Sequence, residues 1–395
     1  MLTTFGGNLP IHSTHLMAGR IAAGAVDMAV ITGGECTLTR RNLAKQGEEP
    51  RRREETRADE VEQFGPVLDM GDLVAVDRGG EIPRNSYAVL DSAIRSRRGE
   101  SIDQARDAAA TLWAGYARVA ADNPHAADRS RPTAAAIRTP SAANRMVSWP
   151  YTKAMCANNT VDQAGALIVC TSELADRLGV PPERRVYPLH CVTGADTTSL
   201  LERDEIAVAP ALQAVAGAVR EFTGDRLDHL DLYSCFPSIV RLTTEALGVD
   251  PGRELTVNGG LAFAGAPLNF AAGQGLIAMI PVLRADPGSI GVVQGNGSHF
   301  DAAFGVYSTA PPTQPPTIVE LGPIGPAPCR RTGPGGRGHD RRGDRRVRPR
   351  RSDPGHRHRP LRRRCPLLGG ERRPGRHAAD HRRRHDRAAC SSKQG

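Results

Sequence analysis

The sequence predicts an α/β fold made of two similar halves, because apolar, strand-like segments alternate with amphipathic, helix-like segments along most of the chain. This alternation recurs in both halves, as a layered, doubly wound architecture requires. A second observation is a pair of glycine-rich turns, at 258–260 and 295–297, which flank a mostly apolar segment of helical length. Glycine permits positive φ and close backbone approach, so the two turns predict a pocket built from main chain.

The predicted strands are apolar runs, and the predicted helices carry apolar residues on one face. Trp113 and Tyr116 are expected to anchor the core on the helix at 102–119. Two buried strands are expected in the first half and two strands in the second, at 27–32, 164–171, 185–194 and 227–233. The predicted helices span 11–24, 87–94, 102–119, 172–178, 210–222 and 239–247.

The composition changes abruptly near residue 330. Residues 330–395 hold 22 arginines and one lysine against six acidic residues, whereas residues 1–329 carry a net charge of −8. The tail has almost no aromatic or β-branched residues, so it cannot bury enough apolar area to offset its chain entropy, and we predict that it is disordered. Three explanations stay open: a shifted reading frame of a GC-rich gene, an arginine-rich arm that binds phosphate backbones, and ordinary disorder.

Eight cysteines occur at irregular spacings without a CxxC pair. Together with the lack of a signal-peptide pattern, they predict reduced thiols in a cytoplasmic protein. No apolar run approaches the roughly 20 residues that span a bilayer, so no membrane association is expected. No aromatic residue interleaves the tail arginines, so no specific nucleic-acid recognition is expected. His12 and His15 lack a second pair of ligands, and no metal site is predicted.

Two sets of motifs stand out along the chain. The first set is a helix, an apolar strand and a Gly-Gly-Glu turn; its residues are Ile21, Gly24, Asp27, Gly33, Gly34 and Glu35. The second set is the Asn-Gly-Gly turn at 258–260, the Gly-x-Pro at 265–267 and the glycine turn at 295–297 that runs on to Gly-Val-Tyr at 305–307. Together these motifs resemble those of the thiolase superfamily. The branch that looks most similar is that of acetyl-CoA acetyltransferase-like proteins related to sterol-carrier thiolases.

The resemblance implies a thiolase-like fold of two βαβ-type halves. The halves would cover residues 1–183 and 184–309, with 40–145 as the inserted loop domain and 310–395 as a Pro-rich linker and the Arg-rich tail. It also implies that the first strands and helices of the amino-terminal half precede Met1 in relatives, so this half is expected to be incomplete and to expose apolar surface. A CoA thioester would be the substrate, with no other cofactor.

The same resemblance places several reactive positions on residues that cannot do the usual chemistry. The nucleophilic cysteine of thiolases falls on Gly7 or Asn8, the histidine of Gly-His-Pro on Ala266, and the second reactive cysteine on Gln294. In the His-Asp-Cys-Phe signature of the sterol-carrier branch, Cys235 and Phe236 match, while Tyr233 and Ser234 replace the first two residues. Acyl transfer needs a thiolate, a base and an oxyanion hole, so activity is doubtful.

The residues that remain at these positions favour binding over turnover. No catalytic residue is assigned; the candidates left are Cys235, Tyr233 and His299, although a cysteine after a buried strand is more often a small core residue. The peptide N–H groups of the two glycine turns are expected to hold a thioester carbonyl or pantetheine amides. These substrate-binding candidates are Asn258, Gly259, Gly260, Gly295, Asn296 and Gly297.

Three functions are therefore open from the sequence. The first is an acyltransferase of the thiolase type, acting on CoA thioesters in lipid metabolism. The second is a non-catalytic protein that binds acyl-CoA, or a partner subunit, present as a dimer or another homo-oligomer or bound to a partner. The third, nucleic-acid binding through the arginine-rich tail, depends on whether that tail is in its native reading frame.

Overall fold

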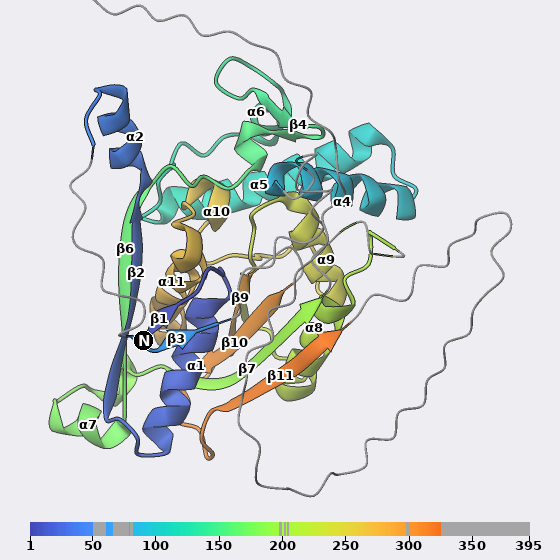
Figure 1. Cartoon of the computed structure of the whole chain (residues 1–395). Helices are drawn as coiled ribbons and strands as arrows, with labels where there is room; N and C mark the ends of the chain where they lie inside the picture. Colours follow the sequence, from blue (N-terminus) through green and yellow to red (C-terminus); the bar gives the residue numbers. More distant parts are fainter. Residues whose placement is uncertain are drawn as a thin grey trace, which may run out of the picture. The chain divides into compact units, whose positions relative to one another are not determined.

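A five-stranded mixed sheet forms the centre of the second half (Figure 1). Its strand order is β11-β7-β10-β9-β8, where β10 is antiparallel to both β7 and β9, β11 is parallel to β7, and β8 is parallel to β9. The strands span Tyr187–Asp196 (β7), His229–Asp231 (β8), Gly291–Asn296 (β9), Ala302–Ser308 (β10) and Thr317–Ile324 (β11). The strands expected at 185–194 and 227–233 are thus confirmed, the second as a shorter strand.

This computed structural model describes residues 1–49, 61–65, 79, 82–196, 200, 203, 205–297 and 301–324. They all belong to one unit, Met1–Thr332. Three parts of the chain lie outside the described residues: the arginine-rich tail, His299 and the charged residues at 50–60.

Apolar side chains of the sheet are buried on both faces, which explains why its strands read as nearly continuous apolar runs. Cys191 of β7 packs with Ile11 and Met279, whereas the next residue, Val192, packs with Val215 on the opposite face. The first face is covered by α1 (Leu9–Ala22) and α11 (Ala271–Ala285), the second by α8 (Pro210–Thr223) and α9 (Pro237–Leu247). All four helices agree with the sequence pattern, and α9 ends at Gly248 in the left-handed conformation.

The two halves repeat one unit, a helix followed by two antiparallel strands. In the second half the unit is α11, β9 and β10; in the first half it is α1, β2 (Met28–Cys36) and β6 (Asp162–Cys170). Helices α1 and α11 contact each other and lie between the β2–β6 ribbon and the five-stranded sheet (Figure 1). The predicted α/β fold of two similar halves is therefore confirmed, but within the described residues the longest strand pair of the first half is this two-stranded ribbon.

The prediction that β2 and β6 are buried strands is wrong. One face of the ribbon packs on α1 and α11, while the other exposes Met28 (49% exposed), Val30 (56%) and Ile168 (70%). A continuous apolar run normally marks a strand covered on both faces, yet no element among the described residues covers this one. The exposed apolar surface expected for the first half therefore lies on this face of the ribbon.

The inserted region is mainly helical and packs against α9 and α10 (Gly260–Phe263). The capping box at Ser101 fixes the start of α5: Ser101 Oγ accepts from the Gln104 N–H at 3.2 Å, and Gln104 Oε1 accepts from the Ser101 N–H at 2.8 Å. Trp113 and Tyr116 are buried on α5, as predicted. The region contains α4 (Pro83–Arg97), α5 (Ile102–Asp122), α6 (Ala134–Arg138), β4 (Met146–Ser148) and β5 (Tyr151–Thr152).

Shorter elements complete the described chain. Strands β1 and β3 pair in parallel, α2 follows β2, and α7 follows β6 where a helix was expected. Their bounds are Leu2–Thr3 (β1), Gln63–Phe64 (β3), Thr37–Lys45 (α2), Ser172–Arg177 (α7), Lys153–Met155 (η2), Pro182–Arg184 (η3) and Leu268–Phe270 (η5).

Two boundaries differ from the sequence prediction. Strand β11, at Thr317–Ile324, lies within the segment assigned to the linker, because its apolar run completes the edge of the sheet beside β7. Gly295 and Asn296 belong to the end of β9 and pair with β10, so the turn begins only at Gly297.

The window Leu268–Ala285 is long and apolar enough to span a membrane by length and composition. It contains η5 and α11, and α11 contacts β6, β8, β9 and α1. These are the contacts of a core helix.

The exposed face of the ribbon leads to a test of self-association. Val30 and Ile168 are opposite each other in the ribbon, so the double variant Val30→Thr, Ile168→Thr should reduce concentration-dependent association in sedimentation velocity. Its free energy of unfolding should change by no more than about 0.5 kcal/mol, as for other surface substitutions. The matched variant Leu167→Thr, at a buried neighbouring position, should cost about 2 kcal/mol or more. Unchanged association of the double variant would contradict an accessible apolar face.

Candidate functional site

The start of the chain lies directly against the end of β9. A Cβ atom built on Gly7 would be 2.6 Å from the Asn296 carbonyl oxygen and 3.2 Å from the Tyr233 hydroxyl oxygen. A Cβ atom on Gly295 would be 2.7 Å from the Gly7 carbonyl oxygen and 2.9 Å from the Asn8 Cα. The structure thus brings Tyr233, Gly295 and Asn296 together beside Gly7, one of the two positions to which the resemblance assigns the nucleophile, and Gly7 has no room for a side chain.

Asn269 holds this amino-terminal loop in place. Its Oδ1 accepts a hydrogen bond from the Gly6 N–H at 3.0 Å, and its Nδ2 donates to the Thr4 carbonyl at 2.8 Å. Both contacts span more than 260 residues of sequence. The side chain therefore fixes the loop from η5, the short helix that precedes α11.

A buried amide network lies behind Gly7. Gln294 Oε1 accepts from the Tyr233 N–H at 3.1 Å, while Gln294 Nε2 donates to Thr243 Oγ1 at 3.1 Å and to Asn296 Oδ1 at 3.0 Å. Gln294 and Asn296 are each about 1% exposed. Among the described residues, Asn296 Nδ2 has no hydrogen-bond acceptor. This amide is a buried donor that a ligand carbonyl would satisfy.

Asp231, at the end of β8, organises the Asn-Gly-Gly turn. Its Oδ1 accepts from Thr256 Oγ1 at 2.7 Å and from the Val257 N–H at 3.0 Å. Burial raises the pKa of Asp231 to about 6, although these hydrogen bonds act in the opposite direction. Nothing in the sequence pattern marked Asp231, apart from its place as an acidic residue at the end of an apolar strand.

The glycines of this turn allow it to pack on α5. Gly259 and Gly260 both have positive φ, 100° and 73°, and a Cβ atom on Gly260 would lie 2.2 Å from the Tyr116 ring. The turn uses its own donors: the Gly259 N–H donates to Thr256 Oγ1 at 3.0 Å, and the Gly260 N–H donates to Asn258 Oδ1 at 2.6 Å. Substrate binding by these residues stays a prediction, but in this conformation their N–H groups are already bonded within the turn.

The remaining glycine turn is similarly engaged. The Gly297 N–H donates to the Asp301 carbonyl at 2.9 Å, and Gly295 and Asn296 pair with β10. The Gly-Ala-Pro segment packs on the polar turn before β6, where the Ala266 N–H donates to the Asn158 carbonyl at 3.0 Å.

The cysteine candidate is buried. Cys235 is 8% exposed, and burial raises its pKa to about 12. Burial likewise raises the pKa of Cys156 and of Cys191 to about 12 each. A thiolate is the nucleophilic form of cysteine, so burial disfavours the reactive form of all three, and the catalytic role of Cys235 stays a prediction. Burial also raises the pKa of Tyr233, which therefore stays protonated.

No group of three or more histidine, cysteine, aspartate and glutamate side chains suited to a metal ion occurs within the described residues. His299 lies outside them, so its candidate role stays a prediction.

Comparison with known proteins agrees with this architecture. A monomeric SCP2-thiolase-like protein type 1 from Mycobacterium smegmatis has 29% sequence identity and a TM-score of 0.63 over 78% of this chain and 62% of that one. A curated relative, the probable acetyl-CoA acetyltransferase of Mycolicibacterium smegmatis, is 28% identical over 149 residues, which are 37% of this chain and 36% of the relative. No family model matches the sequence.

Two more distant structures share the fold. The dimeric peroxisomal thiolase of Saccharomyces cerevisiae has 14% identity and a TM-score of 0.53, over 77% of this chain and 74% of that one. A chain of the Ltp2-ChsH2(DUF35) aldolase has 15% identity and a TM-score of 0.57, over 78% and 79%.

The fold and these similarities support membership of the thiolase superfamily. It spans about a third of the length of the curated relative it matches (36%) and 62% of the length of the solved SCP2-thiolase-like protein.

The raised pKa of Asp231 predicts a specific pH dependence of stability. An unfolded aspartate has a pKa near 3.9, so the folded state binds the proton more tightly. Asp231 therefore contributes stability below about pH 4 that is lost as the pH rises through about 6. The free energy of unfolding of the wild type, minus that of Asp231→Asn, should fall by about 2 kcal/mol between pH 4 and pH 7.

Urea titrations at each pH measure this difference. The surface variant Asp225→Asn controls for the loss of one charge, because its side chain is 98% exposed. A pH-independent difference between wild type and Asp231→Asn would show that the carboxylate is not desolvated beneath the turn.

Proposed function

We propose that this thiolase-superfamily protein binds an acyl thioester of the CoA class without transferring the acyl group. The observation that supports the proposal is the close backbone contact at Gly7, one of the two positions that match the nucleophile, where Asn296 leaves no room for a side chain.

The chemical steps of acyl transfer lack their groups at the corresponding positions. Covalent transfer needs an activated nucleophile, and neither Gly7 nor Asn8 supplies one. Ala266 cannot move a proton, and Gln294 is a neutral amide held by three hydrogen bonds. The nearby thiol of Cys235 is buried and protonated at neutral pH.

Thioester binding is supported by the unpaired donor of Asn296. Leaving a buried N–H donor unpaired costs about 1–3 kcal/mol, which a carbonyl ligand would recover. Asn296 Nδ2 is such a donor among the described residues, and Tyr233 lies at the same site beside Gly7. The carbonyl oxygen of a bound thioester would accept a hydrogen bond from Asn296 Nδ2 here. This binding needs no covalent step.

A second candidate function is that of a partner subunit. It is favoured by the exposed apolar face of the β2–β6 ribbon, since such faces commonly mark interaction sites. One of the structural neighbours is named for an assembly, Ltp2-ChsH2(DUF35). Under this alternative, loss of the exposed apolar side chains would abolish partner binding and leave thioester binding intact.

Two measurements on the full-length chain test the proposal. Incubation with labelled acetyl-CoA followed by intact-mass analysis should show no covalent acyl adduct, and an adduct mapped to Cys235 or another cysteine would restore the enzyme. Equilibrium dialysis with acetyl-pantetheine, which carries no phosphate for the arginine-rich tail to attract, should show saturable binding.

Asn296→Asp replaces the unpaired donor with an acceptor at nearly the same volume, so it should weaken acetyl-pantetheine binding at least tenfold, as expected for about 1.4 kcal/mol or more. Asn269→Asp is the comparison variant, because the amide of Asn269 holds the amino-terminal loop at Gly6. It shows how much acetyl-pantetheine binding changes when the loop position alone is disturbed. Undetectable binding by the wild type would refute the thioester proposal.

A further inference from the structure

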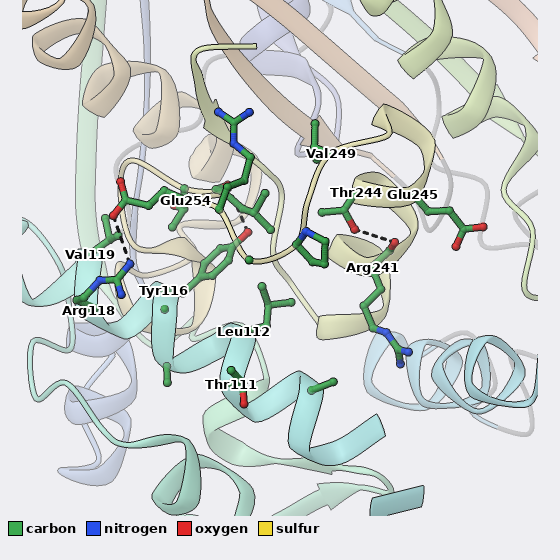
Figure 2. A pocket seen from close by; sticks show the side chains of 18 of the residues that line it. Thr111, Leu112, Tyr116, Arg118, Val119, Arg241, Thr244, Glu245, Val249 and Glu254 are labelled. Carbon is green, nitrogen blue, oxygen red and sulfur yellow. Dashed lines mark hydrogen bonds and ion pairs between the residues drawn. The ribbon is translucent and has the colours of Figure 1, made fainter. Parts of the chain in front are cut away.

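A large cavity lies between the inserted helices and the second half. It has a volume of about 1230 Å³ and is bounded by α4, α5, the end of α9 and the loop at 249–256 (Figure 2). None of the site candidates Tyr233, Asn258 and Gly295 lines it. Its charged lining consists of six arginines and three glutamates: Arg97, Arg98, Arg118, Arg131, Arg241, Arg253, Glu100, Glu245 and Glu254.

At one end of the cavity the arginines have structural partners. Arg97 and Arg98 share the carboxylate of Glu245, at 2.6 and 3.0 Å. Arg241, which is 7% exposed, pairs with Glu100. These charges compensate one another, and Arg97 also lies in the last turn of α4, where a cation stabilises the helix dipole.

At the other end the positive charge is in excess. Arg118 pairs with Glu254 at 3.3 Å, but the side chains are 52% and 69% exposed, and exposed pairs of this kind contribute little (Figure 2). Arg253 donates to two carbonyls, those of Leu227 and Asp228, at 2.6 and 2.9 Å.

Arg131 has no hydrogen-bond or ion-pair partner among the described residues. Its φ of 53° lies in the left-handed region, which a residue with a Cβ atom seldom adopts. Apart from the charges paired at the first end, the lining thus holds three arginines and a single, weakly held carboxylate, that of Glu254.

Between the two ends the wall is apolar. Leu112 and Val119 of α5 and Val249 of the loop line the cavity, and Figure 2 shows Leu112 between Arg118 on one side and Arg241 on the other, with Val119 beside Arg118. Tyr116 stacks on the buried Trp113, with ring centroids 5.3 Å apart, and its hydroxyl donates to the Leu255 carbonyl at 3.4 Å. A ligand on this wall would touch both α5 and the loop that leads to the Asn-Gly-Gly turn.

We propose that this cavity is a binding site for a small organic phosphate with an apolar body. Planar guanidinium groups match the geometry and charge of a phosphate, so Arg118 and Arg131 would hold the phosphate in place of the weak Glu254 pair. The body of the ligand would cover Leu112 and Val119. A cleft with an excess of one charge also concentrates ligands of the opposite charge.

Fluorescence titration of the full-length chain tests this site. The chain has two tryptophans, so the background variant Trp149→Phe leaves Trp113, which stacks on a residue of the cavity, as the reporter. Phenyl phosphate should change its emission saturably, inorganic phosphate should bind more weakly, and phenol should give no change.

In the same background, Arg118→Gln and Arg131→Gln should each weaken phenyl phosphate binding at least fivefold, and Glu254→Gln should strengthen it. Arg129→Gln is the matched control, because Arg129 lies two residues from Arg131 and does not line the cavity. The arginine-rich tail is identical in all these variants.

If Arg129→Gln and Arg131→Gln weakened phenyl phosphate binding equally, the binding would come from diffuse attraction by a basic protein. This result would overturn the proposal. Phenol binding as well as phenyl phosphate would show an apolar cavity without an anion site, which also overturns it.

Discussion

The backbone contact between Gly7 and the end of β9 determines what the site can do. It joins the two repeated helix–strand–strand units, because Gly7 precedes α1 while Asn296 ends β9. A side chain at position 7 would have to displace the Asn296 carbonyl, which is held in the β9–β10 ladder. The contact therefore leaves main chain and no side chain at this position. The neighbouring amides of Gln294 and Asn296 are bonded to each other, and Asn296 Nδ2 has no acceptor among the described residues.

The Asn-Gly-Gly turn at 258–260 depends on one buried carboxylate. Asp231 accepts hydrogen bonds from Thr256 and from the following backbone, and the turn then bonds its own N–H groups and packs on α5. This arrangement links the inserted helices, the Asn-Gly-Gly turn and the sheet. It also places the arginine-lined cavity on the same loop, at 249–256, so that a ligand there would contact the segment that fixes the turn.

The sequence predicted the elements whose apolar periodicity is local, such as α8, α9 and β7. It could not predict the exposure of Val30 and Ile168, because periodicity does not show whether a covering layer is present. Strand β11 was missed because its apolar run follows a proline-rich segment and pairs with residues more than 120 positions away. The motifs selected the residues of the two glycine turns, whose role in binding stays a prediction. The contact at Gly7 and the role of Asp231 arise from long-range contacts, which no local pattern shows.

The most direct test of the account is the stability of Gly7→Ala compared with Gly19→Ala. An added Cβ at residue 7 would meet the Asn296 carbonyl at 2.6 Å, whereas at Gly19 of α1 nothing lies within 4 Å. Gly7→Ala should therefore lower the free energy of unfolding by about 1–3 kcal/mol, as overpacking does. Gly19→Ala should raise it by about 0.5–1 kcal/mol, as expected for alanine within a helix. If Gly7→Ala were as stable as the wild type or more so, residue 7 would not be in close contact with the Asn296 carbonyl. The proposed loss of acyl transfer would then lose its structural basis.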